Sequence, residues 1–264
     1  MRYCGSKKKF ANDIIPILLG AIDSEDTLFV DMCCGGCSII SEMPHKYKWG
    51  VDSNEYVIKL WNKLKTNVMN GYPGDNIPYD ITEEQYKSIK QSYLNRDGRW
   101  EDYIIGYVGN ACSYGGAWFN GFAKPNYNKR NGNGEPENHC HEAYNGLMKQ
   151  LNGFHHIETT EFLCGSFDSF IYPEHSVIYA DPPYFETKSY KDDFPHDRFW
   201  QWVRDMSNSG HKVFVSEYTA PSDFKCIWEK RKKDGMGTTK NGREQNIKLE
   251  RLFVYDRNSN TKKN

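Results

Sequence analysis

The chain has no apolar run approaching the roughly 20 residues that cross a bilayer, and its opening residues, MRYCGSKKKF, lack the apolar stretch of a secretory signal. It also lacks a net excess of charge, because 34 Lys and Arg stand against 35 Asp and Glu. No internal repeat is present. We therefore expect a soluble, cytoplasmic protein with no membrane partner, whose affinity for nucleic acid, if any, depends on local basic patches.

Two kinds of site are missing as well. The glycine-rich segment CCGGCS is not the GxGxxG of dinucleotide-binding proteins, which makes a nicotinamide or flavin enzyme a poor fit. The eight cysteines are spread along a long chain, which favours reduced thiols over a disulfide framework. Cys33, Cys34 and Cys37 contain a CxxC spacing, but no second pair follows at zinc-finger spacing, and the sequence predicts no metal site.

What is present is an alternation of short apolar strands and amphipathic helices. Apolar spacing predicts helices over 10–22, 55–68 and 197–208, and strands over 27–31, 48–52, 176–180, 212–216 and 249–255. The first strand runs into the glycine turn, after which we expect a helix to begin. This order predicts an α/β fold with a mostly parallel sheet, whose ligands bind at the carboxyl ends of the strands.

Residues 71–152 differ from the flanking sequence in composition, which predicts an inserted, mostly helical region. Residues 1–70 and 153–264 are expected to form the catalytic domain. Helices are expected over 82–95 and 100–112, and another begins near His139. Between them lies an aromatic and basic segment that is a natural candidate for substrate recognition. Its candidate DNA-binding residues are Trp118, Asn120, Lys124, Asn126, Lys129 and Arg130. Trp118 and Phe119 could instead cover the core of the insert. A second basic stretch, 230–246, is expected to be a loop.

The most specific motif is Asp181-Pro182-Pro183-Tyr184, which directly follows the apolar strand 176–180. An aromatic exocyclic amine is a poor nucleophile until acceptors hold its hydrogens. The Asp181 carboxylate and the Pro182 carbonyl can supply them, on a turn stiffened by two prolines. Tyr184 offers a ring face on which a base taken out of a duplex can stack. The motif therefore predicts methyl transfer to an amine.

Acidic residues end the first two strands of the predicted sheet. Asp31 could hold the ammonium of an amino-acid-like ligand, and Asp52 could accept hydrogen bonds from ribose hydroxyls. The glycine turn after Asp31 would let such a ligand approach the backbone at a helix N-terminus. A purely structural turn is the alternative interpretation of the same pattern.

Together these motifs resemble those of the DNA adenine-N6 methyltransferases of the Dam-like (alpha, D12) class, particularly its small phage-borne relatives. RYCGSKKKF, FVDMCCGGCS, GVDSN, DPPY and VFVSEY occur in the family's order over nearly the whole chain. The resemblance implies a Rossmann-like fold that uses S-adenosylmethionine to methylate adenine N6 in duplex DNA by base flipping and direct transfer. It also implies a bacterial protein, or a phage protein acting in the host cytoplasm. A restriction endonuclease partner would leave no signature in this chain.

Carried onto this sequence, the resemblance implies a cofactor site in which Lys7 lies near the cofactor's carboxylate. The implied cofactor-binding residues are Tyr3, Gly5, Lys7, Asp31, Cys33, Gly35, Gly36, Asp52, Ser166, Phe167 and Asp181. Two departures from the family pattern are Cys37, where a third glycine is common, and Ser166, where aspartate is frequent. Asp168 is close enough in sequence to act as the acceptor in place of Ser166.

Four alternatives remain open at this point. The same chemistry could act on RNA, on cytosine N4 or on a protein glutamine, although Asp at position 181 favours adenine over Asn-Pro-Pro-Tyr and Ser-Pro-Pro-Tyr enzymes. The chain could also be a DNA-binding protein that has lost catalysis, for which Cys37 and Ser166 are the only hints.

Overall fold

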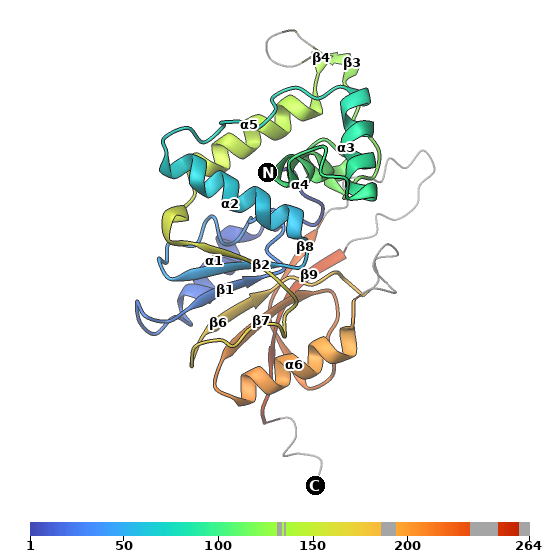
Figure 1. Ribbon diagram of the computed structural model, residues 1–264. Coiled ribbons are helices and arrows are strands. Elements are labelled where there is room, and N and C mark those ends of the chain that lie inside the picture. The colour runs from blue at the N-terminus through green and yellow to red at the C-terminus, as the bar shows by residue number, and fades with distance from the viewer. Residues whose placement is uncertain (131–133, 135, 186–193, 233–247, 259–264) are drawn as a thin grey trace, which may run out of the picture.

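A seven-stranded sheet forms the centre of the computed structural model, which describes residues 1–130, 134, 136–185, 194–232 and 248–258 (Figure 1). The strands of this sheet are β1 (Phe29–Met32), β2 (Lys48–Asp52), β5 (Glu161–Cys164), β6 (Val177–Ala180), β7 (Lys212–Glu217), β8 (Phe224–Lys232) and β9 (Lys248–Tyr255). The α-helices are α1 (Ala11–Leu19), α2 (Glu55–Met69), α3 (Glu83–Asn95), α4 (Asp102–Ala111), α5 (His139–Asn152) and α6 (His196–Asn208).

The order of the strands is that of a doubly wound fold. Across the sheet it is β5-β2-β1-β6-β7-β9-β8, and the first five strands are parallel, whereas β9 runs antiparallel to both β7 and β8. Counted among the strands of this sheet, the first five follow the Rossmann order 3-2-1-4-5. The predicted Rossmann-like α/β fold is therefore confirmed, and the strand order switches between β1 and β6, the point at which open α/β sheets bind ligands at their carboxyl ends.

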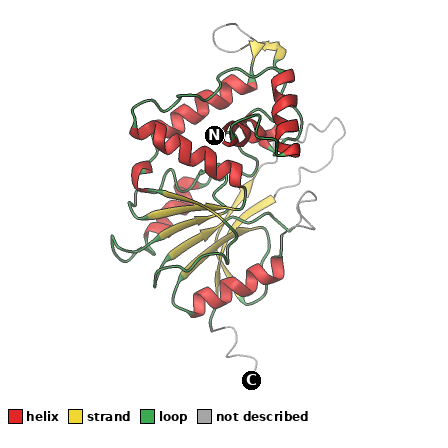
Figure 2. Cartoon of the chain, in the orientation of Figure 1, coloured by secondary structure: helices red, strands yellow, loops and turns green. Residues whose placement is uncertain are grey.

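Helices cover both faces of this sheet. In Figure 2, α6 lies on one side and α2 to α5 are stacked on the other. Alternate residues of the buried strands divide accordingly: Phe29 and Tyr179 join the core beneath α1 and α2, whereas Val30 and Ile178 join the core beneath α6. On β1, β6, β7 and β9, every second residue therefore faces the insert side of the sheet.

The insert itself is mostly helical, as predicted. It contains α3, α4 and α5, the short 3-10 helix η1 (Tyr114–Gly116) and a two-stranded ribbon of β3 (Asn126–Arg130) and β4 (Pro136–Glu137). Thr82 caps α3 in a reciprocal capping box with Gln85, which satisfies backbone donors at the helix start. The N-terminal segment contacts both the insert and the turns after β1. Cys4 N donates to Gly116 O in the insert, and Lys7 N donates to the Ser38 hydroxyl after β1.

The close packing of α4 on α2 gives a testable consequence. A Cβ added at Gly106 of α4 would overlap the Tyr56 carbonyl oxygen of α2, whereas a Cβ at Gly146 of α5 would meet nothing within 4 Å. We expect Gly106→Ala to lower the free energy of unfolding by about 1–3 kcal/mol. The matched control Gly146→Ala should leave it unchanged or raise it by up to about 1 kcal/mol. Thermal unfolding of both variants checks this, and equal melting temperatures would contradict the packing argument.

Two elements differ from the sequence prediction. The expected helix after the glycine turn is absent, because residues 33–42 form successive turns in which Cys33, Gly35 and Cys37 have positive φ. β8 was not predicted, and Lys230, expected to begin a basic loop, lies within this strand. The rest of that expected loop, from 233 onward, lies outside the described residues. Among the described helices, none combines the length and apolarity needed to span a membrane.

Candidate active site

Three acidic side chains lie near the carboxyl ends of neighbouring parallel strands. Asp31 lies in β1, Asp52 is the last residue of β2, and Asp181 directly follows β6. The Asp181 backbone N–H donates to Met32 O at 3.2 Å, which fixes the start of the Asp-Pro-Pro-Tyr turn against the neighbouring strand. The strand order therefore brings together three carboxyls that are far apart in sequence.

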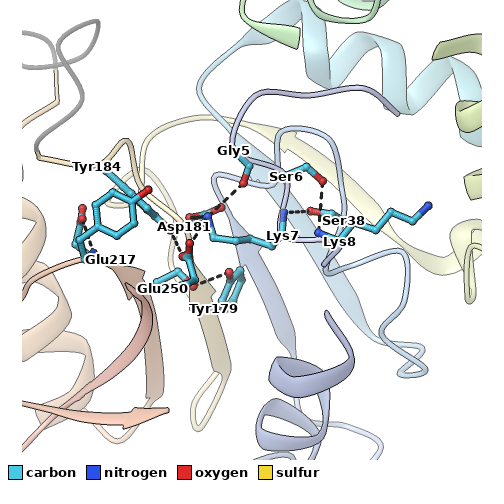
Figure 3. A network of polar contacts seen from close by, with 12 residues as sticks. Gly5, Ser6, Lys7, Lys8, Ser38, Tyr179, Asp181, Tyr184, Glu217 and Glu250 are labelled. Atoms are coloured by element: carbon cyan, nitrogen blue, oxygen red, sulfur yellow. Dashed lines mark hydrogen bonds and ion pairs between the residues drawn. The ribbon is translucent and has the colours of Figure 1, made fainter. Parts of the chain in front are cut away.

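Lys7 connects the N-terminal segment to this turn. Its Nζ lies 2.7 Å from Asp181 Oδ1 and 3.5 Å from Glu250 Oε1, and it donates to Gly5 O at 3.2 Å (Figure 3). The same ammonium lies 4.6 Å from the centroid of the Tyr184 ring, within cation–π range. Lys7, implied by the resemblance to lie near the cofactor carboxylate, thus contacts the carboxylate of the Asp-Pro-Pro-Tyr motif.

Glu250 completes the network from β9, the strand that lies beside β7. It lies on β9, its side chain is fully buried, and it accepts a hydrogen bond from the Tyr184 hydroxyl through Oε1. Its second oxygen, Oε2, is buried without a hydrogen-bond partner among the described residues. Four side chains from three separate parts of the chain, Lys7, Asp181, Tyr184 and Glu250, form one buried polar cluster.

The pKa values within this cluster follow from burial and charge. Burial raises the pKa of Asp181 to about 6, while the Lys7 ammonium opposes the shift. Burial lowers the pKa of Lys7, but the carboxylates of Asp181 and Glu250 outweigh it, so the pKa lies above its ordinary value. At neutral pH the structure therefore holds an ionised Asp181 beside a charged Lys7.

Asp31 is the most strongly perturbed carboxyl at this edge. It is 2% exposed and accepts a hydrogen bond from Ile40 N at 3.1 Å. Burial is the main cause that raises its pKa to about 8; the Ile40 N–H opposes the shift, and the carboxylates of Asp181 and Asp52 add to it. Such a group favours a cationic partner, because a positive charge beside it would restore the ionised form.

The side chain of Asp52 stabilises the glycine turn. Its Oδ2 accepts from Gly35 N and its Oδ1 from Asn54 N, both at 2.9 Å. Burial raises the pKa of Asp52, and these backbone donors oppose the shift. The expected close approach at Gly35 and Gly36 is made by Tyr3, because a Cβ at Gly36 would lie 2.7 Å from Tyr3 Cβ. Because Gly35 and Gly36 carry no side chain, they leave room for the side chain of Tyr3.

Cys33, with positive φ, is half-buried directly after β1, and burial raises the pKa of its thiol. The remaining predicted cofactor-binding residues lie in the segment after β5. Ser166 N donates to the Ser169 hydroxyl, while Phe167 is 3% exposed and packs with Phe199 in the core beneath α6. Asp168, the alternative acceptor, forms an ion pair with Arg198.

The predicted DNA-binding residues of the insert divide into packed and exposed ones. Trp118 is half-buried among aromatic rings, with Tyr93 at 5.4 Å and Phe119 at 5.0 Å between centroids, so it covers the core of the insert. This packing favours the interpretation that Trp118 covers the core of the insert over its assignment as a DNA-binding residue. Asn120, Lys124 and Lys129 are exposed, and Asn126 is half-buried; Lys124 lies 2.8 Å from Glu83. Arg130 is the last residue of β3.

The motif interpretation missed three residues that the structure brings to this region. Glu250 joins the Lys7 cluster, and Glu217 accepts from the Phe185 backbone N–H at 3.3 Å, just after the Asp-Pro-Pro-Tyr turn. Burial raises the pKa of Glu217 to about 7. Tyr114 is 59% exposed on η1, which the N-terminal segment contacts. The only sequence signal for Glu250 was a carboxylate within the apolar run LERLFVY.

The donor set suits an organic cofactor that carries positive charge. Asp31, Asp52 and Asp181 outnumber the ammonium of Lys7 at this edge, and a cationic ligand would relieve the excess negative charge. Within the part of the chain that the structure describes, no group of three or more His, Cys, Asp or Glu side chains is arranged to hold a metal ion.

A doubly wound sheet with this acidic edge and an Asp-Pro-Pro-Tyr turn is the arrangement expected of a Rossmann-like methyltransferase. A family model described as D12 class N6 adenine-specific DNA methyltransferase matches residues 3–232, and the chain belongs to this family. The resemblance stated from the motifs is confirmed.

Comparison with individual proteins adds only a distant structural likeness. The crystal structure of SMU.472, described as a methyltransferase complexed with SAH, matches with 10% sequence identity and a TM-score of 0.34. The match covers 95% of this chain and 53% of that protein, so this chain spans about half of its length. No curated protein matches the chain in sequence.

Proposed function

We propose that this protein transfers a methyl group from S-adenosylmethionine to the N6 amine of adenine in duplex DNA. The observation that carries the proposal is the Asp181 carboxylate, held at the sheet edge beside the Tyr184 ring in a chain of the D12 family. With DNA as the acceptor, the protein would act in the cytoplasm of a bacterial cell, or of a phage's host.

The proposed reaction needs an amine whose hydrogens are held by fixed acceptors. The Asp181 carboxylate and the Pro182 carbonyl would accept them, which favours a more tetrahedral nitrogen and frees its lone pair. Bound S-adenosylmethionine supplies a methyl group on a sulfonium. The nitrogen–carbon bond would form as the carbon–sulfur bond breaks, and one amine proton would leave toward Asp181.

The ring of Tyr184 would stack on the adenine taken out of the duplex. It is half-buried and packs edge-on against Tyr218, with 4.4 Å between the ring centroids. Its hydroxyl is held by Glu250, so the orientation of the ring is fixed before a base arrives. This preorganisation lowers the cost of ordering the site on binding.

Asp31 and Asp52 would hold the cofactor together with Tyr3 and the Gly35 turn. Asp31 suits the amino-acid ammonium, since it is buried and its pKa stays raised although the Lys48 ammonium lowers it. Asp52 already uses both oxygens for backbone N–H groups, so its proposed part is to shape the turn as much as to bind ribose. Gly5 would act through Lys7, which donates to its carbonyl.

We propose that residues 71–152 form the target-recognition region of a catalytic domain made of 1–70 and 153–264. Asn120, Lys124, Asn126 and Lys129 offer the side-chain chemistry for phosphates and base edges, and Tyr114 offers an exposed ring. The insert and the carboxyl edge of the sheet are joined by the N-terminal segment, so a duplex held by one can reach the other.

Removing the exposed lysines of the insert should weaken DNA binding without changing its sequence preference. For Lys124→Ala and Lys129→Ala we expect each lost phosphate contact to reduce the slope of log K against log salt by about 1. Filter binding at several salt concentrations measures this slope. Lys212→Ala is the matched control, because Lys212 pairs with Asp23 at the opposite edge of the sheet. An unchanged slope in both insert variants would contradict the proposed DNA surface.

The proposed acceptor is tested by offering labelled S-adenosylmethionine with unmethylated duplex DNA, RNA of the same sequence or a protein extract. We expect label in the DNA alone. Label in the RNA or in protein would identify that molecule, and not duplex DNA, as the methyl acceptor. Intact DNA binding with no measurable affinity for S-adenosylmethionine would instead support a DNA-binding protein without catalysis.

A further inference from the structure

A buried ammonium occupies the place that the proposed mechanism gives to the substrate amine. Lys7 Nζ is a nitrogen donor 2.7 Å from Asp181 and 4.6 Å from the centre of the Tyr184 ring. The target amine is proposed to donate to the same carboxylate, with its base on the same ring. Lys7 Nζ holds Asp181 Oδ1 and lies over the same ring, so a substrate amine that donates to this oxygen displaces it.

Glu250 offers a second position for that ammonium. Its Oε1 is 3.5 Å from Lys7 Nζ, and its Oε2 is buried with no hydrogen-bond partner among the described residues. Leaving a buried carboxylate oxygen unsatisfied is costly, and an ammonium with three donors can satisfy it. The flexible stem of Lys7 allows Nζ to shift by the distance that a direct hydrogen bond to Glu250 requires.

The position of Glu250 on its strand supports a role beyond packing. Leu252, two residues along β9, points to the same face of the sheet and joins the apolar core. Replacing a buried ion pair with apolar side chains is often neutral or stabilising, so a charge retained at this point calls for a reason other than stability. The only described ammonium within reach of Glu250 is that of Lys7.

We propose that Glu250 is a positioning residue that receives the Lys7 ammonium when the substrate amine takes its place at Asp181. In the free protein Lys7 stands in for the amine and keeps Asp181 ionised. On substrate binding the ammonium passes to Glu250, which leaves Asp181 free to accept hydrogen from the amine and keeps the positive charge buried with a partner. This inference rests on the proposed methyl transfer to an amine.

Glu250→Gln separates this role from a structural one. Glutamine keeps the size of the side chain and an oxygen for the Tyr184 hydroxyl, but it offers no charge to Lys7, which then stays on Asp181. We expect the single-turnover methylation rate to fall about 10- to 100-fold, with an unchanged melting temperature and an unchanged dissociation constant for S-adenosylmethionine. Glu229→Gln is the matched control, because Glu229 pairs with Arg251 on the exposed side of the β8–β9 hairpin.

The double variant Lys7→Met/Glu250→Gln gives the decisive comparison. Lys7 lowers and Glu250 raises the pKa of Asp181, and removing both takes away one positive and one negative charge, so the net charge around that carboxyl is unchanged. At pH 8 and saturating S-adenosylmethionine, we expect the double variant to methylate faster than Glu250→Gln, because nothing then blocks Asp181. A merely structural Glu250 would make the double variant equal to Glu250→Gln or slower.

The outcomes distinguish the two proposals. A wild-type rate in Glu250→Gln, or a double variant no faster than Glu250→Gln, overturns the role of Glu250, while wild-type methylation of DNA upholds the proposed function. If the wild-type protein methylates RNA or protein in place of DNA, the proposed function fails, and the same variants are compared on that acceptor. The rate order predicted for them is the same, since any amine must displace Lys7 from Asp181.

Discussion

Replacing Asp181 by asparagine is expected to reduce methyl transfer by about 10²–10³-fold or more, because one preorganised group at the reacting atom is worth that much. The amide keeps the size of the carboxyl but loses its charge and presents an N–H₂ group that donates where the amine needs an acceptor. Its place at the sheet edge, fixed by the backbone bond from Asp181 N to Met32 O, should be retained.

The measurement is a single-turnover rate with labelled S-adenosylmethionine, alongside cofactor binding by calorimetry. Asp23→Asn is the matched control, since Asp23 is exposed and pairs with Lys212 at the amino end of the strands. We expect the control to methylate at the wild-type rate and Asp181→Asn to bind cofactor while failing to turn over. Near-native turnover in Asp181→Asn would refute the assigned role of this carboxylate.

The second large effect is expected at Asp31, where binding and stability should change in opposite directions. Asparagine can still accept the hydrogen bond from Ile40 N, but it cannot pair with a cationic ligand. A charge-assisted hydrogen bond contributes about 1.5–3 kcal/mol, so Asp31→Asn should weaken binding of S-adenosylmethionine by roughly 10- to 100-fold. Removal of a strained acid should raise the melting temperature, by about 2–4 °C for each kcal/mol gained.

The pH dependence of this gain has a definite sign. The folded pKa of Asp31 is about 8, above the value of about 3.9 in an unfolded chain, so between these values the native state holds the extra proton. The contribution of Asp31 to the stability of the wild-type protein therefore falls as the pH rises from 4 to 8, by up to about 1.4 kcal/mol for each unit. Asparagine does not titrate, so the advantage of Asp31→Asn should be absent below pH 4 and grow toward pH 8.

Denaturant unfolding of both proteins at several pH values checks the stability prediction. A constant difference between them across this range would mean that Asp31 is not a buried, protonated acid. In the wild-type protein, affinity for the cationic cofactor should rise as the pH increases toward 8, because Asp31 must ionise to pair with it. An affinity that falls over that interval would contradict the assignment of Asp31 to the ammonium.

The edge of the sheet was predictable from sequence because its residues follow local rules. Asp31, Asp52 and Asp181 each lie near the end of a short apolar strand, and parallel strands place their carboxyl ends at one edge. The double proline after Asp181 made that turn recognisable without tertiary information. The fold and the acidic edge therefore followed from patterns of a few residues each.

The segment after β1 was wrongly predicted because its turns depend on tertiary contacts. Cys33 and Cys37 adopt positive φ, which non-glycine residues rarely do, and the surrounding bonds hold them there. Asp31 accepts from Ile40 N and Asp52 accepts from Gly35 N, so side chains on two strands fix the backbone that a helix would have used. Local propensity contains no information on such contacts.

The partners of the site residues were beyond the reach of motif reasoning. Lys7 and Glu250 lie near opposite ends of the chain, and only the antiparallel placement of β9 beside β7 brings Glu250 to the Asp-Pro-Pro-Tyr turn. Trp118 was ambiguous for a similar reason, since the ring of Tyr93 that packs against it comes from α3, far from it in sequence. In both cases the chemistry of the residue was visible but its neighbours were not.

The central claim, methylation of adenine N6 in DNA, is tested most directly by identifying the methylated nucleoside. Purified protein is incubated with isotopically labelled S-adenosylmethionine and unmethylated duplex DNA, and the DNA is digested to nucleosides for mass spectrometry. We predict label in N6-methyldeoxyadenosine, and none when Asp181→Asn replaces the wild-type protein. Label in N4-methyldeoxycytidine, or unlabelled DNA from a protein shown to bind the cofactor, would contradict the claim.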